Sequence, residues 1–545
     1  MSELLSSPPS SHPISSPSDS HSSSLPGRIM AIIVQLAQGL QSLAGTLTNP
    51  ANLSQILQTL AVGLVLILIL TQLAQRINVD KNAPPEVPYW IPYLGSAIAF
   101  SVNPVKFYED NRKKYGDIFT YTMVGRKFTV CLGTEGNNFV FNAKLADVSA
   151  EESYKPLTTP VFGKGVVYDC PNHMLMEQKK FVKWGMSNDA FRAYVPEMEE
   201  ETRTYFQRWN NKVGGRGDLF TAMGELIINT ASRTLMGPEI RSLMDESVAQ
   251  LYHDLDDGFQ PINMFFEWLP LPSYFRRDNA HRKMRETFMK VIQDRRANNI
   301  TDKTDMLQSL MNQTYKDGTP FTDVDACHLM IALLMAGQHT SSTTATWALM
   351  FLAQNPQLVK DLLAEQKDVL GSIDANLTFD SLKDMTLLDN VVRETLRLRP
   401  PIIMILRKVI RPLAYTGTDY VIPKGNYIAA SPIATQVDEK YYKNALSFDP
   451  RRWENIVEEE TGETIDYGFG KIAGGGARNP SLPFGAGRHR CIGETFAYVQ
   501  LKTVISTFIR MYDLSLTEKG MPGSDFTKMF VQPELPVEIN YKPRK

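Results

Sequence analysis

The chain has 545 residues, 43% of them hydrophobic and 21% charged, and a formal net charge of −2. This is ordinary globular composition, and it lacks the basic excess that a nucleic-acid-binding protein shows, so we expect no nucleic-acid partner. The four cysteines include no C-x-x-C pair, which argues against a zinc site made of cysteines. A secreted scaffold held by disulfides would carry more cysteines at closer spacing, so we favour one cysteine with its own chemistry over two disulfides.

The first 50 residues predict two different segments. Residues 1–27 contain 12 Ser and 5 Pro, a composition that cannot bury enough apolar surface to fold, so we expect a disordered tail. Residues 28–50 place Ile and Leu side chains at helical spacing with Gln between them. This pattern is typical of an amphipathic helix that lies on a membrane surface.

A stronger apolar stretch follows, and it predicts a transmembrane helix over residues 55–76. Ile56 to Ala74 are almost entirely apolar, which is long enough to cross a bilayer. The alternatives are a buried core helix or a cleaved signal peptide, but the stretch lies far from the start and has no A-x-A site. Arg76 and Lys81 follow the helix while only Arg28 precedes it, which favours a cytosolic main domain.

The remaining chain reads as one domain behind a Pro-rich hinge at residues 77–92. Ile118–Leu132 alternates around Gly125-Arg126 and predicts a β-hairpin. Most of 185–400 reads as helices, including a long apolar helix that opens with the capping signal Thr322-Asp323-Val324-Asp325. Short strands and turns follow residue 400, so the predicted fold of residues 93–545 is mainly α with small β-sheets.

The segment from Phe484 to Gly493 carries the chemistry. It reads F-G-A-G-R-H-R-C-I-G, and the run after Cys491 is helical in pattern, which places Cys491 at a helix N-terminus that favours a thiolate. The alternative is an inert buried cysteine. The segment resembles the haem-binding loop of the cytochromes P-450. That resemblance implies the cytochrome P-450 fold for residues 93–545, haem b as cofactor, and Cys491 as the axial ligand of its iron.

Two charged motifs precede the loop. Glu394 and Arg397 lie three apart, on one helix face, and alone would be read as a surface ion pair. Arg452 stands between them and Cys491 in F-D-P-R-R-W. The order resembles the family's E-x-x-R motif and the element that follows it, which implies a structural triad of Glu394, Arg397 and Arg452.

The long helix contains A-G-Q-H-T-S-S from Ala336 to Ser342. Oxygen chemistry beside an iron needs space and protons: Gly337 would leave room, Thr340 would hold a water, and His339 would pass protons inward. The alternative for His339 is a hydrogen-bonded core histidine. Where most of the family has an acid, this form resembles one branch, the sterol 14α-demethylases, and implies catalytic roles for Thr340 and His339.

Residues 154–169, Y-K-P-L-T-T-P-V-F-G-K-G-V-V-Y-D, resemble a signature loop of the same branch. The resemblance implies haem contacts by Tyr154, Tyr168, Lys179, Arg407, His489, Phe484 and Gly485. It implies a sterol pocket lined by Tyr154, Leu157, Phe162, Ala336, Gly337, Met404 and Met529. Plain core packing is the alternative for the Leu, Phe and Met positions. Fungal members have His-Ser at Ile403-Met404, but the Gly-rich loop 466–481 is similar to theirs, so we expect a fungal-type enzyme.

The resemblance implies a function: three oxidations that remove the 14α-methyl group of lanosterol or 24-methylenedihydrolanosterol as formate, in ergosterol-type sterol biosynthesis. No G-x-G-x-x-G follows a strand, so we expect electrons from NADPH through a separate cytochrome P-450 reductase. The resemblance also implies azole-type inhibitors and a single-pass endoplasmic reticulum enzyme with its catalytic domain in the cytosol. The alternatives are a haem-thiolate monooxygenase acting on another apolar substrate and a non-catalytic haem- or sterol-binding protein.

Overall fold

The structure is a computed structural model that describes residues 53–77, 80–209, 213–244, 246–303, 305–454 and 476–544. The expected tail at 1–27, the expected surface helix at 28–50 and most of the Gly-rich loop 466–481 lie outside the described residues. Clustering of contacts divides the chain into two units, residues 1–74 and 75–545.

The first unit contributes the apolar helix α2, in the place where the sequence predicts it. It spans Leu53–Ile77, and its Gln55–Gln75 stretch is long and apolar enough to cross a membrane. Its large apolar side chains, among them Leu60, Leu64 and Leu70, are exposed. An exposed apolar helix of this length fits an N-terminal membrane anchor.

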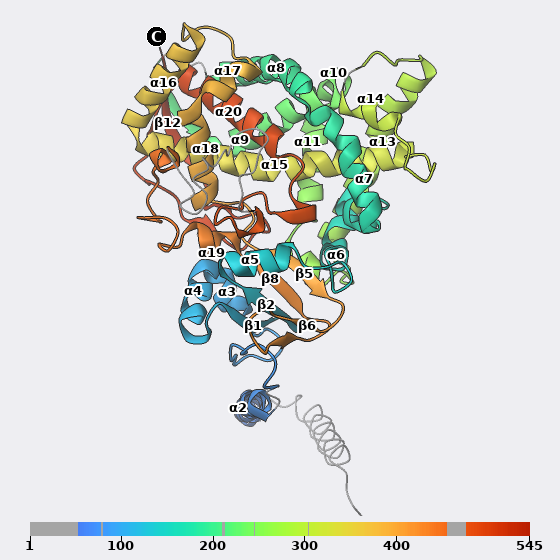
Figure 1. The fold of residues 1–545 in the computed structure, drawn as a ribbon, viewed down its shortest axis with the longest axis vertical. Coiled ribbons are helices and arrows are strands. Elements are labelled where there is room, and N and C mark those ends of the chain that lie inside the picture. Colours follow the sequence, from blue (N-terminus) through green and yellow to red (C-terminus); the bar gives the residue numbers. More distant parts are fainter. Residues whose placement is uncertain are drawn as a thin grey trace, which may run out of the picture. The chain divides into compact units, whose positions relative to one another are not determined.

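Helices dominate the second unit, as the sequence predicts, and the long helix α15 runs through it (Figure 1). Its start is fixed by a capping box in which Thr322 and Asp325 bond each other's backbone N–H groups. α15 packs against α9, α13, α18 and α20. The helices after α2 are α3 (Ala97–Val102), α4 (Pro104–Tyr115), α5 (Gly133–Phe141), α6 (Glu151–Phe162), α7 (Asn172–Lys183), α8 (Asn188–Phe206), α9 (Leu219–Ala231), α10 (Pro238–Ser242), α11 (Glu246–Asp256), α12 (Pro261–Phe265), α13 (Pro272–Ala297), α14 (Met306–Met311), α15 (Asp323–Gln354), α16 (Pro356–Leu370), α17 (Phe379–Asp384), α18 (Thr386–Leu398), α19 (Pro432–Gln436) and α20 (Glu494–Met511).

The strands form small sheets, the largest with the order β1-β2-β8-β5-β3. The predicted hairpin is present: β1 and β2 pair from Ile118↔Cys131 to Met123↔Arg126. The strands are β1 (Ile118–Met123), β2 (Arg126–Cys131), β3 (Val148–Ser149), β4 (Gly215–Asp218), β5 (Ile405–Val409), β6 (Leu413–Ala414), β7 (Val421–Ile422), β8 (Tyr427–Ala430), β9 (Tyr512–Leu516), β10 (Ser524–Asp525), β11 (Gln532–Pro533) and β12 (Glu538–Pro543).

The second half of the expected hinge is docked on β1. The backbone of Val87 donates to the carbonyl of Thr120, and the backbone of Thr120 donates to that of Pro85. The hydroxyl of Thr122 donates to the carboxylate of Glu86. These contacts pair the segment with the edge of β1, all six residues of which are buried.

Candidate functional site

The loop from Phe484 to Gly493 presents Cys491 just before α20. The backbone N–H of Cys491 donates to the carbonyl of Phe484 at 3.0 Å, which closes the loop. Gly487 has φ +64, and a Cβ there would meet the carbonyl oxygen of Phe141 at 2.7 Å, so only glycine fits this turn. All four cysteines are described, and Cys491 alone is exposed.

The thiol of Cys491 differs from the sequence expectation in its electrostatics. Burial by the surrounding protein raises its pKa, although a hydrogen bond from the Gly493 backbone and the charge of Lys179 oppose the shift. The helix start therefore does not make a thiolate by itself. A thiol that is accessible to a small molecule yet enclosed by protein fits a metal ligand, because a coordinated cation removes the thiol proton.

The middle of α15 is more exposed to solvent than the C-terminal half of the helix. Ala336 is exposed and the residues from Gly337 to Thr340 are half-buried, whereas Ser341 to Ala353 are all buried. A Cβ built on Gly337 would meet no atom within 4 Å. The hydroxyl of Thr340 donates to the carbonyl of Ala336 at 2.9 Å, which leaves its oxygen free to accept a hydrogen bond. This stretch is the one the sequence predicts to face the reaction.

Positive charge gathers beside the loop. The ammonium of Lys179 donates to the backbone carbonyls of Arg488 and Arg490, at 3.1 and 2.8 Å. The guanidinium of Arg407 is 4% exposed and donates to the carbonyl of Leu406. Burial and the charges of Arg407, Lys179 and Arg488 lower the pKa of His489 to about 3.

Among the described residues, no carboxylate lies within ion-pair distance of Lys179, Arg407 or Arg488. The Nδ1 of His489 is buried and also has no hydrogen-bond partner there. A cationic cluster that contains an orphaned donor or acceptor needs an anionic group to be stable. The two propionates of a haem are such a group, so the residues present fit this cofactor.

Two tyrosines adjoin the cationic cluster. The rings of Tyr154 and Tyr168 are stacked at 5.0 Å, and Tyr168 lies 6.1 Å from the imidazole of His489. The backbone N–H of Leu406, next to Arg407, donates to the hydroxyl of Tyr154. Burial raises the pKa of both phenols, so they remain neutral hydrogen-bonding groups. The structure thus brings together five residues that the sequence predicts for the haem.

His339 has a partner that the sequence analysis missed. Its Nε2 lies 2.7 Å from Oδ1 of Asp256, the last residue of α11. Its ring is also stacked on Phe530. No short sequence motif joins these residues, because the contact forms only when α11 and the C-terminal region pack on α15.

The predicted sterol-contacting residues differ in their surroundings. Phe162 is buried and its ring stacks on that of Phe259 at 5.6 Å, whereas Leu157 is 1% exposed within α6. The thioether of Met404 accepts a hydrogen bond from the buried hydroxyl of Tyr108 at 3.3 Å. Met529 is half-buried in the loop between β10 and β11.

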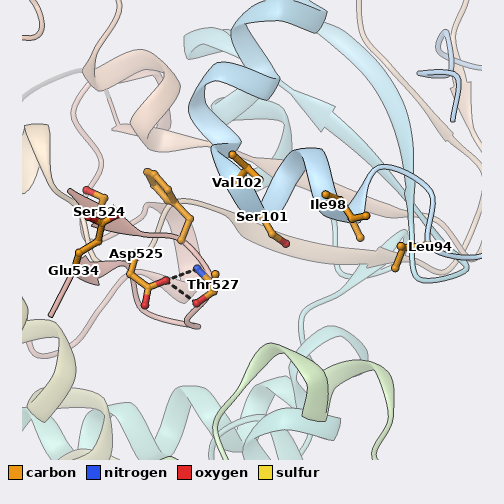
Figure 2. Close-up of a pocket in the computed structure, with 10 residues that line it drawn as sticks. Leu94, Ile98, Ser101, Val102, Ser524, Asp525, Thr527 and Glu534 are labelled. Atoms are coloured by element: carbon orange, nitrogen blue, oxygen red, sulfur yellow. Dashed lines mark hydrogen bonds between the residues drawn. The ribbon is translucent and has the colours of Figure 1, made fainter. Parts of the chain in front are cut away.

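A cavity of about 470 Å³ opens between α3 and the β10–β11 region (Figure 2). Its wall is apolar on the α3 side, where Leu94, Ile98 and Val102 lie, and polar on the other. There the carboxylate of Asp525 accepts hydrogen bonds from the backbone and hydroxyl of Thr527, at 2.9 and 2.6 Å. The cavity is open to solvent, and none of its lining residues is one that the sequence predicts for the sterol pocket.

The charged motifs form a buried network. Glu394 accepts two hydrogen bonds from Arg397, both at 2.8 Å, and one from Arg452 at the same distance. Arg397 also donates to the backbone carbonyls of Gln436, Ala445 and Ser447. The network fastens α18 to the segment that leads to the Cys491 loop.

Comparisons with known proteins agree with this site. The family model "Cytochrome P450", written cytochrome P-450 here, matches residues 85–541. A lanosterol 14-alpha demethylase of Cunninghamella elegans is 49% identical, over 88% of this chain and 95% of that protein. Lanosterol 14-alpha demethylase erg11 of Schizosaccharomyces pombe is 47% identical, over 90% of this chain and 99% of that protein.

Among solved structures, the retinoic acid bound cyanobacterial CYP120A1 matches with a TM-score of 0.72 at 20% identity, over 86% of this chain and all of that one. This likeness concerns the fold. The family match and the relatives show that the chain belongs to the cytochrome P-450 family, in the branch of the fungal sterol 14-alpha demethylases.

Proposed function

We propose that this chain is a sterol 14α-demethylase that removes the 14α-methyl group of lanosterol or 24-methylenedihydrolanosterol as formate. The observation that carries the proposal is the exposed Cys491 beside a cationic cluster, in a chain that is 45–49% identical to fungal lanosterol and sterol 14-alpha demethylases over most of its length. In this role the enzyme would serve ergosterol-type sterol biosynthesis.

The residues suggest how the haem is held. Cys491 would ligate the iron, with Phe484 and Gly485 shaping the loop around it. Lys179, Arg407, His489 and the two tyrosines Tyr154 and Tyr168 would bind the propionates by charge and hydrogen bonds. When bound, the haem supplies an iron centre that activates O₂ for the oxidation of an unreactive C–H bond.

The helix α15 would position the reacting groups. Gly337 and Ala336 leave space along the open stretch of the helix, and the Thr340 oxygen would accept a hydrogen bond from a water there. His339, whose Nε2 lies 2.7 Å from the Asp256 carboxylate, would hold and release the proton that this water passes inward. A positioned proton donor of this kind typically contributes a factor of ~10²–10⁴ in rate.

The substrate would be positioned by shape, because a sterol offers only its 3-hydroxyl for polar recognition. Leu157, Phe162, Met404 and Met529 would form the apolar wall, and the cavity between α3 and β10–β11 would be the entrance (Figure 2). Shape complementarity would then place one methyl group near the iron. Azole-type inhibitors, which join an iron-binding nitrogen to an apolar tail, would use the same space.

Electrons and location follow from the rest of the chain. We propose that a separate NADPH-dependent cytochrome P-450 reductase delivers the electrons on the same membrane. The apolar Gln55–Gln75 stretch of α2 and the positive residues Arg76 and Lys81 after that stretch favour a single-pass anchor in the endoplasmic reticulum, with residues 93–545 as a catalytic domain in the cytosol.

The test is reconstitution of the full-length protein in lipid nanodiscs with a fungal reductase, NADPH and O₂. Each of the two sterols should yield its 14-demethylated diene and an equal amount of formate, whereas the Cys491→Ala variant should yield neither. An azole should shift the Soret band to longer wavelength at near-stoichiometric amounts. If neither sterol is converted while the reductase demonstrably reduces the haem, the proposed substrate is wrong.

A further inference from the structure

The C-terminal hairpin, residues 523–534 with strands β10 and β11, has two contacts that sequence motifs do not suggest. On one side Ser524, Asp525, Phe526, Thr527 and Glu534 line the entrance cavity (Figure 2). On the other side Phe530, in the loop between the strands, reaches the histidine of α15. One short hairpin therefore contacts both the entrance cavity and the proposed proton donor.

The contact of Phe530 with His339 is a parallel ring stack. The two ring centroids are 5.6 Å apart and the planes differ by 12°. The Phe530 ring also stacks on the ring of Phe259, with centroids 5.6 Å apart and planes that differ by 5°. Phe259 in turn stacks on Phe162 at 5.6 Å. Offset parallel rings at this separation attract each other and fix each other's planes.

Among the described residues, the His339 ring has two close contacts. Its Nε2 lies 2.7 Å from the Asp256 carboxylate, without the alignment of a hydrogen bond, and its ring plane stacks on Phe530. A single contact at Nε2 leaves the ring free to turn about its χ2 bond, a torsion that has a broad energy minimum. The flat contact with Phe530 removes that freedom. The backbone of the neighbouring Val531 donates to the carbonyl of Pro401 at 2.8 Å, which anchors the loop that carries Phe530.

We propose that Phe530 is a positioning residue for His339, which holds the imidazole plane so that Nε2 stays on the Asp256 carboxylate. The proposal rests on the proposed function, in which His339 passes protons. Phe530 itself transfers no proton. It determines the fraction of time that the His339 ring spends in the orientation from which a proton can be transferred. The aromatic row Phe162–Phe259–Phe530–His339 then joins the C-terminal end of α6 to the proposed proton route.

The first test measures His339 directly and needs no turnover. In D₂O the C2 hydrogen of each histidine ring exchanges slowly, and mass spectrometry of peptides reads the rate for His339 alone. Phe530→Leu, which keeps apolar bulk but loses the ring, should raise that rate roughly 2- to 10-fold, the population change expected from losing one aromatic stack. The matched control is Phe526→Leu, which removes the same ring from the same hairpin on its entrance side and should leave the rate unchanged.

The second test asks whether Phe530 acts through His339. In nanodiscs with reductase, Phe530→Leu should bind sterol with wild-type affinity but form less product per NADPH, with the difference appearing as hydrogen peroxide. The double variant Phe530→Leu/His339→Ala should be no worse than His339→Ala alone, because a positioning residue has no effect once its target is gone. Additive losses would show a merely structural role.

The two possible failures are distinguishable. Wild-type coupling in His339→Ala would remove the proton role and with it the proposed mechanism. Impaired coupling in His339→Ala together with an unchanged C2 exchange rate in Phe530→Leu would leave the mechanism intact and overturn the role of Phe530. The haem content, measured from the carbon monoxide difference spectrum of each variant, shows whether it has folded.

Discussion

The carboxylate of Glu394 accepts a hydrogen bond from the guanidinium of Arg452 at 2.8 Å, across 58 positions of sequence. It accepts another from the indole of Trp453 at 3.0 Å and two from Arg397. Glu394 and Arg397 are fully buried. The Glu394 carboxylate thus neutralises two guanidinium groups, those of Arg397 and Arg452, where α18 meets residues 450–453.

Glu394→Gln should therefore destabilise the protein by roughly 3–5 kcal/mol, the usual cost of leaving a buried charge without its partner. Urea unfolding followed by tryptophan fluorescence would measure the loss. Glu109→Gln, which removes an exposed ion pair with Lys113, is the control and should leave the midpoint unchanged. Equal midpoints for the two variants would show that the network contributes nothing to stability.

Removing the buried cation beside the haem loop should weaken haem binding. In the proposed site Arg407 would bind a propionate, so Arg407→Leu should remove that charge-assisted hydrogen bond and lower the haem affinity roughly 10- to 100-fold. The measurement is transfer of haem from each variant to a haem-scavenging apoprotein. Arg411→Leu, an exposed arginine just after β5, is the control and should lose haem at the wild-type rate.

Cys491→Ala should abolish the thiolate-type absorbance of the reduced, carbon monoxide-treated protein and all turnover. The reason is that Cys491 is the one exposed cysteine and lies in the haem-loop context. Cys170→Ala, at a buried cysteine whose thiol donates to the carbonyl of Val167, should keep both properties. Persistence of the thiolate absorbance in Cys491→Ala would show that another residue ligates the iron.

Deletion of residues 1–74 should give a protein that still binds haem and sterol but leaves membranes more easily. This cut follows the boundary of the two units and keeps Gln75, whose side chain exchanges two hydrogen bonds with the backbone of Tyr89. Vesicle flotation measures the release. Some attachment should remain, because the large apolar side chains of Trp90, Tyr93 and Val102 are exposed.

If the deletion variant fails to take up haem, the anchor is part of the catalytic fold and the proposed domain boundary is wrong. If it binds vesicles as strongly as the full chain, α2 is not the main anchor. Trp90→Ala in the deletion variant should lower the remaining vesicle binding without changing haem uptake.

Acid should destabilise the protein through a histidine pair that lies apart from the haem residues. His281 of α13 and His328 of α15 have ring centroids 5.1 Å apart. Burial, His328 and Arg285 lower the pKa of His281 to about 4, against a hydrogen bond with the Phe162 backbone and the charge of Asp278. An unfolded histidine has a pKa near 6.5, so between pH 6.5 and 4 the unfolded state binds the extra proton and stability falls.

His281→Gln should reduce this loss by about 2 kcal/mol at pH 5 relative to pH 7. Glutamine keeps a donor for the Phe162 carbonyl but does not titrate. Urea midpoints of the two proteins at pH 7, 6 and 5 provide the measurement. The same pH dependence in both would mean that His281 is not the group that takes up the proton.

The sequence predicts the features that short segments determine. The β1–β2 hairpin, the Thr322 cap, the apolar helix and the Cys491 loop each depend on neighbours within a few positions, so local pattern is enough. The resemblance also pointed to the residues of the cationic cluster, in which Lys179 and Arg407 lie far apart in sequence; that this cluster contacts a haem stays a prediction. These predictions succeed where glycine, cysteine, helix-capping or long apolar stretches are involved, because such residues fit only a few structural environments.

The features that the sequence did not predict depend on tertiary packing. Asp256 and Phe530 meet His339 only after α11, α15 and the C-terminal hairpin pack together, and an Asp or Phe alone does not indicate a site in the sequence. The pKa of Cys491 was expected to fall at a helix start, but burial raises it, and the extent of burial depends on the whole fold. The docking of Pro85 and Val87 on β1 was not predicted, because the proline-rich composition of this segment favoured a free hinge.

Lys179, Arg407 and Arg488 have no carboxylate partner within the part of the chain that the structure describes, and this makes the fold sensitive to the supply of its own prosthetic group. Their mutual repulsion disfavours the compact chain, and an anion that binds only the native state stabilises it by mass action. The amount of active protein in a cell should therefore follow the concentration of free haem during synthesis. When haem is scarce, newly made chains should stay unfolded and be degraded by cellular proteases. A shortage of iron or porphyrin should therefore also lower sterol production.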